Sequence, residues 1–300
     1  MTDVVLAVDL GGTNLRMAAV TRDGEILAHA HTDSQKEGTH ADLLDDLGRL
    51  AKDCGCVDRN VIGFGVGVPA NFNAEGVLTH VTNLPNLTGM NLKAELSAKF
   101  EVPVVLENDA TAATIGENWL GASKDVSDSI MLTLGTGVGG GIIVNNKPFR
   151  GIDGTAGRLG HICVEADGYP CPCGNRGCIE QYASATAIVR MANERGLDVQ
   201  TSSDVYNAAK RGDERALAVF KTMGRYLGIH LGGLVNALNP EMIVIGGGVA
   251  TGIDAYIEPL TAEMHARAFH EPGERAKIVK GELEDNAGIL GAAHSAFLIS

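Results

Sequence analysis

The sequence predicts an α/β protein built from two similar domains with a cleft between them. Strands and helices alternate along the 300 residues, as is typical of α/β folds. A strand, a glycine turn and a second strand at residues 4–24 start again roughly 125 residues later, which indicates a weak internal repeat. Glycine accounts for 39 residues, nearly double its usual share of about 7%. Because these glycines interrupt Val/Ile/Leu runs, they predict tight turns and close backbone approach to a ligand rather than disorder.

The first half of the chain reads as a meander followed by alternating helices and strands. Short apolar runs separated by turns at 4–8, 15–20 and 25–31 predict an antiparallel meander. Leucines at helical spacing predict a helix over 40–53. We expect a buried strand at 61–68, a helix at 91–100, a strand at 102–106 and a helix at 109–120.

The second half repeats the opening pattern and then becomes helical. We expect a strand at 130–134, a glycine turn at 135–141, a strand at 142–144 and a turn at 145–146. Residues 216–238 predict a long helix in which Gly224, Gly228 and Gly232 allow close helix packing. A strand at 242–245 then runs into a glycine turn and a further helix. The predicted domains are 1–120, completed by a C-terminal helix at 286–300, and 121–285.

Charge and hydropathy exclude several classes of partner. Lys and Arg total 24 against 37 Asp and Glu, a net charge of −13. This balance argues against a nucleic-acid or anionic-membrane surface. Apolar runs fall short of the ~18–20 residues of a membrane helix. The first residues lack the basic region of a signal peptide, so we expect a cytoplasmic protein.

Three glycine turns are candidate phosphate sites. Asp9, Gly11, Gly12, Thr13 and Asn14 lie at the first hairpin, where backbone amides and the Thr hydroxyl can donate to phosphate and Asp9 can hold Mg²⁺ through water. Taken alone, this motif reads equally well as a plain Gly-Gly hairpin. The second turn holds Gly135, Thr136 and Gly137, and the third holds Gly246, Gly247 and Gly248.

The second turn also matches the dinucleotide fingerprint G-x-G-x-x-G. That fingerprint needs a helix directly after its glycines, so that the helix N-terminus faces the pyrophosphate. Here the β-branched run 142–144 follows instead. The sequence therefore favours a phosphate hairpin and weighs against a dinucleotide oxidoreductase.

A second cluster of chemically active side chains combines cysteines with a histidine. Cys163, Cys171, Cys173 and Cys178 lie within 16 residues, beside His161. In a chain without a secretory signal, such clustering favours a metal site over disulfides. Cys163 is predicted to be a buried core thiol, and Cys54 and Cys56 to be loop thiols.

These motifs together resemble a known family. Two glycine-threonine hairpins and a late Gly-Gly-Gly turn look like the sugar-kinase branch of the actin-like ATPases. The stretch 160–180 is similar to the signature of the ROK group (repressors, open reading frames, kinases), and the resemblance covers essentially the whole chain. It implies two ribonuclease-H-like α/β domains that close on sugar and ATP, and it implies a homodimer.

The resemblance also implies roles for individual residues. Asp109 would be the general base and Asn108 a sugar ligand, whereas from the sequence alone Asp109 reads equally well as a helix N-cap. Asn83 and Glu180 match sugar-binding residues of the family; their plainer readings are a turn residue before Pro85 and a surface carboxylate. The last set, within the loop 161–180, would bind structural Zn²⁺, with His161 also contacting sugar: His161, Cys171, Cys173 and Cys178.

One position departs from the family pattern. The family usually has Glu three residues before the metal histidine, where it accepts hydrogen bonds from sugar hydroxyls. This chain has Arg158 there, which cannot accept a hydrogen bond. Three hypotheses follow: a changed pocket for a different sugar or an acceptor-bearing substituent, an arginine that turns outward, or a degenerate site.

The leading functional prediction is ATP-dependent phosphorylation of a hexose at its 6-hydroxyl, with Mg²⁺ bound to ATP, as in glucokinases. The alternative is an N-acetylglucosamine or N-acetylmannosamine kinase on the same scaffold. The family's sugar-responsive repressors form a different class. They need a helix-turn-helix domain before the first hairpin, whereas the first strand here begins at Val4. The expected partners are sugar and ATP, without nucleic acid or membrane.

Overall fold

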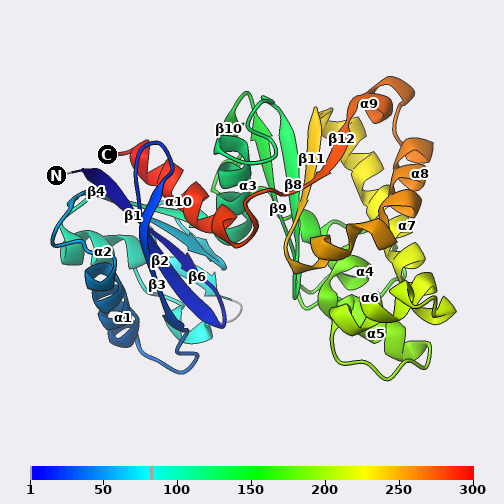
Figure 1. Cartoon of the computed structure of the whole chain (residues 1–300), viewed down its shortest axis with the longest axis horizontal. Coiled ribbons are helices and arrows are strands. Elements are labelled where there is room, and N and C mark those ends of the chain that lie inside the picture. Colours follow the sequence, from blue (N-terminus) through cyan, green and yellow to red (C-terminus); the bar gives the residue numbers. More distant parts are fainter. Residues whose placement is uncertain (1, 82–83) are drawn as a thin grey trace.

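The computed structural model describes residues 2–81 and 84–300, which form two α/β halves side by side (Figure 1). The first half contains a five-stranded sheet of order β3-β2-β1-β4-β7. Strands β1 to β3 form the predicted antiparallel meander, and β4 and β7 run parallel to β1. The strands are β1 (Asp3–Leu10), β2 (Asn14–Val20), β3 (Ile26–Asp33), β4 (Asn60–Val68) and β7 (Val104–Asn108).

The second half repeats this topology. Its sheet has the order β10-β9-β8-β11-β12, again with three antiparallel strands followed by two parallel ones. The repeat predicted from residues 4–24 is therefore confirmed as a repeat of strand order and direction. The strands are β8 (Ser129–Leu134), β9 (Val138–Val144), β10 (Lys147–Pro148), β11 (Met242–Gly246) and β12 (Lys277–Lys280).

Helices cover both faces of the first sheet. Alternate residues of a strand face opposite sides, so Val4, Leu6 and Val8 of β1 pack with α1 (His40–Asp53) and α2 (Leu92–Phe100). The residues between them, Val5 and Ala7, pack with α10 (Ala287–Phe297). Figure 1 shows α1 on one side of this sheet and α10 on the side toward the second half. The C-terminal helix thus returns to the N-terminal sheet.

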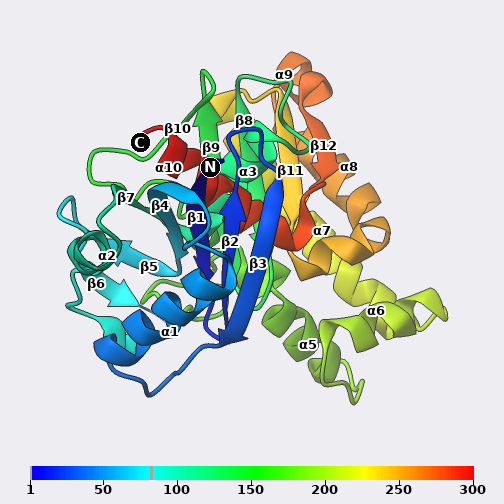
Figure 2. The same ribbon diagram turned by 60° about the vertical axis from the view of Figure 1, so that its left-hand side comes forward.

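Glycines allow α10 to approach its neighbours closely. A Cβ on Gly65 of β4 would lie 2.0 Å from the carbonyl oxygen of Ala292 in α10. In the same way, α3 (Asp109–Trp119) crosses α10 at Gly116. A short hairpin of β5 (Ala70–Phe72) and β6 (Leu78–Val81) lies near α2 (Figure 2) and leads toward η1 (Pro85–Leu87).

The second half is mainly helical beyond its sheet. The close packing predicted for Gly224, Gly228 and Gly232 is confirmed, because a Cβ on Gly228 would lie 2.6 Å from the carbonyl oxygen of Leu260. Among the described residues, no helix combines the length and apolarity needed to span a membrane. The helices are α4 (Glu180–Ala183), α5 (Ala185–Glu194), α6 (Ser202–Lys210), α7 (Glu214–Leu238), α8 (Ile257–Arg267) and α9 (His270–Arg275), with η2 (Leu159–His161), η3 (Gly248–Ala255) and η4 (Glu284–Asn286).

Two details differ from the sequence predictions. Strand β9 begins at Val138, so the second glycine turn covers only 135–137, and the glycines that follow belong to the strand. Glycine is required at these strand positions because neighbouring elements pack closely against β9. A Cβ on Gly140, for example, would lie 2.8 Å from the Leu159 side chain. The prediction that Cys163 is a buried core thiol was also wrong, because Cys163 is exposed. Cys54 and Cys56 lie in the turn after α1, as predicted, but Cys54 is buried in the core of the first half.

Candidate active site

The first glycine turn borders an open hollow of about 510 Å³. The Gly11 amide donates to the Asn14 carbonyl (2.8 Å), and the Ser34 hydroxyl donates to the Gly11 carbonyl (2.7 Å). In the described part of the chain, the Gly12 and Thr13 amides have no protein acceptor. Those donors are therefore free to bind an anion such as phosphate. The hollow is lined by Asp9, Gly11, Gly12, Thr13, Asn14, Arg16, His31 and Asp285.

A cation that the sequence analysis missed also lies in this hollow. Arg16 forms an ion pair with Asp9, its partner directly across β1 and β2. The hairpin register contained the signal, because a turn closed at Leu10 and Leu15 necessarily pairs the next residues, Asp9 and Arg16. The carboxylate expected to hold Mg²⁺ and the positively charged Arg16 thus line the same hollow as the free amides.

The second and third glycine turns lie together at the end of the second sheet. The Gly135 amide donates to the Gly137 carbonyl (3.0 Å), and the hydroxyl of Thr186 in α5 donates to the Thr136 carbonyl (2.9 Å). Gly247 has a φ of +81°, and a Cβ there would lie 2.5 Å from the carbonyl oxygen of Leu134. This turn therefore packs against the end of β8, directly before the second hairpin.

Asp109 is the first residue of α3 and is half-buried. The N-cap position belongs to Asn108, which is buried and makes no side-chain capping bond, so the N-cap reading of Asp109 is wrong. Burial raises the pKa of the Asp109 carboxyl above its ordinary value, and the charge of Asp9 acts in the same direction. The Ala110 amide, which donates to Oδ1 at 2.9 Å, and the Arg158 guanidinium both act against this rise.

The first turn of α3 contacts both halves. A Cβ on Gly67, the partner of Asp9 across β1 and β4, would lie 3.9 Å from the Asp109 Cα. A Cβ on Gly139 of β9 would lie 2.7 Å from the Ala110 side chain. The start of α3 therefore lies between β4, the neighbour of β1, and β9, the strand that follows the second glycine turn.

The histidine and three cysteines predicted to bind metal converge. The possible ligand atoms of His161, Cys171, Cys173 and Cys178 all lie within 4.8 Å of one another. The Cys171 Sγ is 3.7 Å from the His161 Nδ1, and the Sγ atoms of Cys173 and Cys178 are 3.7 Å apart. Four ligands around tetrahedral zinc lie roughly 3.3–3.8 Å apart. Burial raises the pKa of the Cys178 thiol, so a bound cation would be needed to hold it as a thiolate. The donor set fits Zn²⁺.

Glu180 connects the cysteine loop to the second glycine turn. Its Oε2 accepts a hydrogen bond from the Val138 amide (3.0 Å), while its Oε1 lies 3.8 Å from the Cys171 Sγ. It is half-buried rather than a free surface carboxylate. The other predicted sugar ligand from the first half, Asn83, lies outside the described residues.

Arg158 turns inward. Its Nη2 donates to the carbonyl oxygen of Ala70 (3.5 Å) and to Oδ1 of Asn71, both on β5. The hypothesis of an outward-turned arginine is therefore wrong for this structure. A second arginine that the sequence analysis missed, Arg150, crosses between the halves to the buried carboxylate of Glu107.

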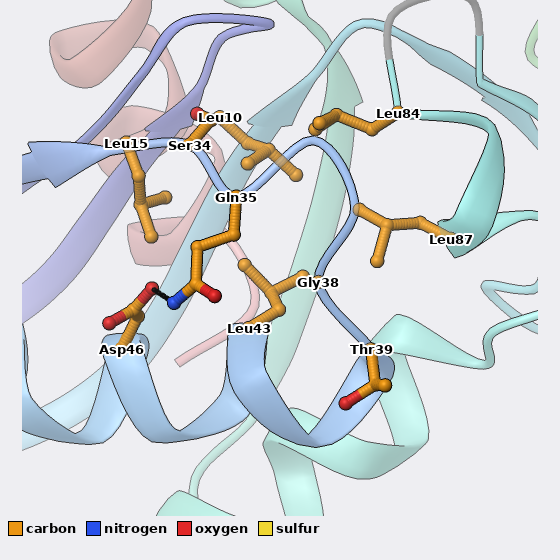
Figure 3. Close-up of a pocket in the computed structure, with 10 residues that line it drawn as sticks. All are labelled: Leu10, Leu15, Ser34, Gln35, Gly38, Thr39, Leu43, Asp46, Leu84 and Leu87. Atoms are coloured by element: carbon orange, nitrogen blue, oxygen red, sulfur yellow. Dashed lines mark hydrogen bonds between the residues drawn. The ribbon is translucent and has the colours of Figure 1, made fainter.

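A small pocket in the first half lies beside the N-terminal part of α1. It has room for about 20 Å³, about the space of one water molecule, and is far too small for a sugar. Figure 3 shows apolar side chains such as Leu10, Leu43 and Leu87 pointing into it, and the Gln35 side-chain amide donating to Asp46 at 2.9 Å.

Two sheets with one strand order, each opening on a glycine-turned hairpin, define a protein with two domains of the actin-like ATPase fold. The chain belongs to the ROK family, which it matches over residues 5–297. It is 36% identical over 306 residues to a glucokinase of Halalkalibacterium halodurans, covering 95% of this chain and 92% of the relative. A xylose repressor of Caldicellulosiruptor bescii is 31% identical over 306 residues, but the match covers 96% of this chain and only 76% of the repressor.

Solved structures support the same relationship. The ROK glucokinase of Streptomyces griseus, crystallised with glucose and AMPPNP, is 30% identical, with a TM-score of 0.83 over 98% of this chain and 99% of that one. The ROK hexokinase of Thermus thermophilus is also 30% identical, with a TM-score of 0.87 over 99% and 98% of the two chains.

Proposed function

We propose that this protein is an ATP-dependent hexose kinase that transfers the γ-phosphoryl group of ATP to the 6-hydroxyl of an aldohexose. The similarity to glucokinases and a hexokinase extends over nearly the whole chain. The observation that carries the proposal is the placement of Asp109 at the start of α3, a helix whose first turn lies against β4 of the first half and against β9, the strand that follows the second glycine turn. Phosphoryl transfer needs such positioning together with an acceptor for the hydroxyl proton.

Asp109 would act as the general base. Its raised pKa makes the carboxylate a better proton acceptor than an ordinary Asp carboxylate. Asn108, at the same strand–helix junction, would bind a sugar hydroxyl. The same sugar would meet His161 and Glu180 from the other half and Asn83 from the first.

The ATP phosphates would be held mainly by backbone amides. The Gly12 and Thr13 amides of the first turn face the hollow, and turns 135–137 and 246–248 would hold the rest of the nucleotide. Magnesium bound with ATP supplies charge neutralisation, and Asp9 would hold it through water. Arg16 would then exchange its contact with Asp9 for a phosphate oxygen.

We further infer that the cysteine cluster is a structural zinc site. Four protein ligands leave no open coordination position, so its residues would act by holding the loop 161–180 rather than by chemistry. The site would fix Glu180 and the ring of His161. A cytoplasmic homodimer remains our expectation from the family resemblance, and light scattering of the purified protein tests its oligomeric state.

The kinase activity is tested by measuring sugar-dependent ADP release over a panel of aldohexoses and N-acetylhexosamines. We expect turnover with a hexose, and Asp109→Asn should lower kcat by about 10²–10⁴-fold while sugar binding, measured by calorimetry, persists. The matched control is Asp198→Asn, at an exposed position. No turnover with any of these sugars would refute the kinase. A near-normal rate in Asp109→Asn would exclude Asp109 as the base, and turnover confined to N-acetylhexosamines would favour the alternative kinase.

A further inference from the structure

Arg158 joins the two halves of the molecule beside the proposed base. It precedes η2 in the second half, and its guanidinium donates to Ala70 and Asn71 on β5 of the first half. These residues are 87 and 88 positions apart in the chain, so the contact depends on how the two halves meet. The β5–β6 hairpin is therefore tied to η2 by one side chain.

The backbone around Arg158 is held firmly against β9. Gly157 has a φ of +86° and lies close to the Gly140 carbonyl. A Cβ on Gly160 would lie 1.9 Å from the Val138 carbonyl oxygen. Leu159, between them, is 4% exposed. Because η2 cannot shift without breaking this packing, β9 fixes the backbone position from which the Arg158 side chain extends.

The strand register places the Arg158 guanidinium near the base: its acceptor Ala70 lies two residues past Val68, and the partner of Val68 across β4 and β7 is Asn108, which precedes Asp109. The charged groups that face Asp109 are Asp9 on β1, which is paired with Arg16, and Arg158. Burial and Asp9 both favour the neutral carboxyl, whereas Arg158 favours the carboxylate. Burial also lowers the pKa of the Arg158 guanidinium, and Asp109 opposes that change, so the two side chains stabilise each other's charged form.

The two arginines that cross between the halves, Arg150 and Arg158, differ in the charge of their partners. Arg150 lies against the carboxylate of Glu107, which is 2% exposed and also accepts from Ser295 at 2.9 Å. Its charge is neutralised by direct contact. Within the described residues, the hydrogen-bond acceptors of Arg158 are both neutral carbonyl oxygens, so its charge remains available to Asp109.

Building on the proposed function, we propose that Arg158 is a positioning residue that clasps β5–β6 to η2 and holds a positive charge against Asp109, keeping the base ionised. A guanidinium has five donors and no acceptor. Where the family pattern has a hydrogen-bond acceptor, this chain therefore has a donor that connects the two halves and places a positive charge near Asp109.

Three variants separate the clasp from the charge. Arg158→Gln removes the charge, Arg158→Lys keeps the charge but loses the planar set of donors, and Asn71→Ala removes an acceptor without changing any charge. Arg211→Gln, at an exposed position, is the matched control. The measurements are the pH profile of kcat/KM, the KM values for sugar and ATP, and hydrogen exchange of amides 70–72 and 78–81.

The proposal makes distinct predictions for each variant. Arg158→Gln should move the acid limb of kcat/KM to higher pH, and Arg158→Lys should restore it. Asn71→Ala should raise the KM for sugar about tenfold, the effect of losing one charge-assisted hydrogen bond, and speed exchange in β5–β6 without moving the limb. The KM for ATP should stay within twofold in all of them.

Two results would overturn the proposal: an unmoved acid limb in Arg158→Gln, or unchanged exchange in β5–β6 in both Arg158→Gln and Asn71→Ala. A wild-type protein without turnover on any sugar would instead refute the proposed function. In that case exchange in the free protein still tests the clasp, and direct NMR titration of Asp109 in wild type and Arg158→Gln still tests the charge.

Discussion

Glu117 is the residue whose replacement tests most directly how the two domains are joined. It lies near the end of α3 and is 1% exposed. Its carboxylate contacts both chain segments that connect the two halves. Its Oε2 accepts from the amides of Ala122 (2.8 Å) and Glu282 (3.2 Å), and its Oε1 accepts from Leu283 (2.9 Å). One carboxylate therefore holds the first connection near 122 and the second near 282.

The structure allows the cost of Glu117→Ala to be worked out. The substitution removes three hydrogen bonds that part-buried amides donate to one carboxylate, and each such bond contributes about 1–3 kcal/mol. Even the lower limit, about 3 kcal/mol, is a large part of a typical net stability of about 5–15 kcal/mol. With an unfolding entropy of about 2.1 cal/mol/K per residue, this lowers the Tm of a 300-residue chain by roughly 5 °C.

Differential scanning calorimetry measures this effect. Glu117→Gln retains an acceptor oxygen but turns a donor toward the amides, so we expect an intermediate loss. Glu282→Ala is the control, because its amide contacts Glu117 while its own side chain is exposed; it should change stability by no more than about 0.5 kcal/mol. A Tm change below about 2 °C in Glu117→Ala would show that these bonds do not hold the connections.

Three further predictions follow from the site and its packing. Because burial raises the pKa of Asp109, kcat/KM should be lost as pH falls at a pH above the ordinary titration range of Asp, and a limb within that range would contradict this assignment. Cys178→Ser should reduce bound zinc, measured by mass spectrometry, and lower the Tm; an unchanged Tm after verified metal loss would refute a structural role. Gly65→Ala should cost about 1–3 kcal/mol by overpacking, because its Cβ would lie 2.0 Å from the Ala292 carbonyl oxygen. Gly233→Ala, where a Cβ meets no atom within 4 Å, should cost nothing in the same denaturation assay.

Local elements were predictable because their signals are local. Leucines at helical spacing predicted the helix at 40–53, which the structure places at His40–Asp53. The glycine run at 135–141 was the exception: a glycine in a strand and a glycine in a turn look alike in sequence, and only the packing of η2 on β9 distinguishes them.

Part of the candidate site could be predicted for the same reason. The four side chains that could hold a metal ion come from a stretch of 18 residues, so their spacing in the sequence already indicated a candidate site. Arg16 could have been found from hairpin register, since it lies directly opposite Asp9. Arg150 and Glu117 had no such signal, because their partners lie 43 and up to 166 residues away.

The sequence by itself determined the α/β class, the internal repeat, the glycine turns and the cluster of cysteines beside His161. Each of these depends on residue type and on spacing over a few turns of chain. Only the tertiary structure decided that Arg158 turns inward to β5 and that Asp109 lies between the two domains. Only it decided, too, how closely the last helix packs against β4 of the first sheet. Those outcomes depend on how surfaces far apart in the sequence pack together. A contact across the domain junction produces no periodic pattern in the residues next to it in the chain, so the sequence alone does not predict it.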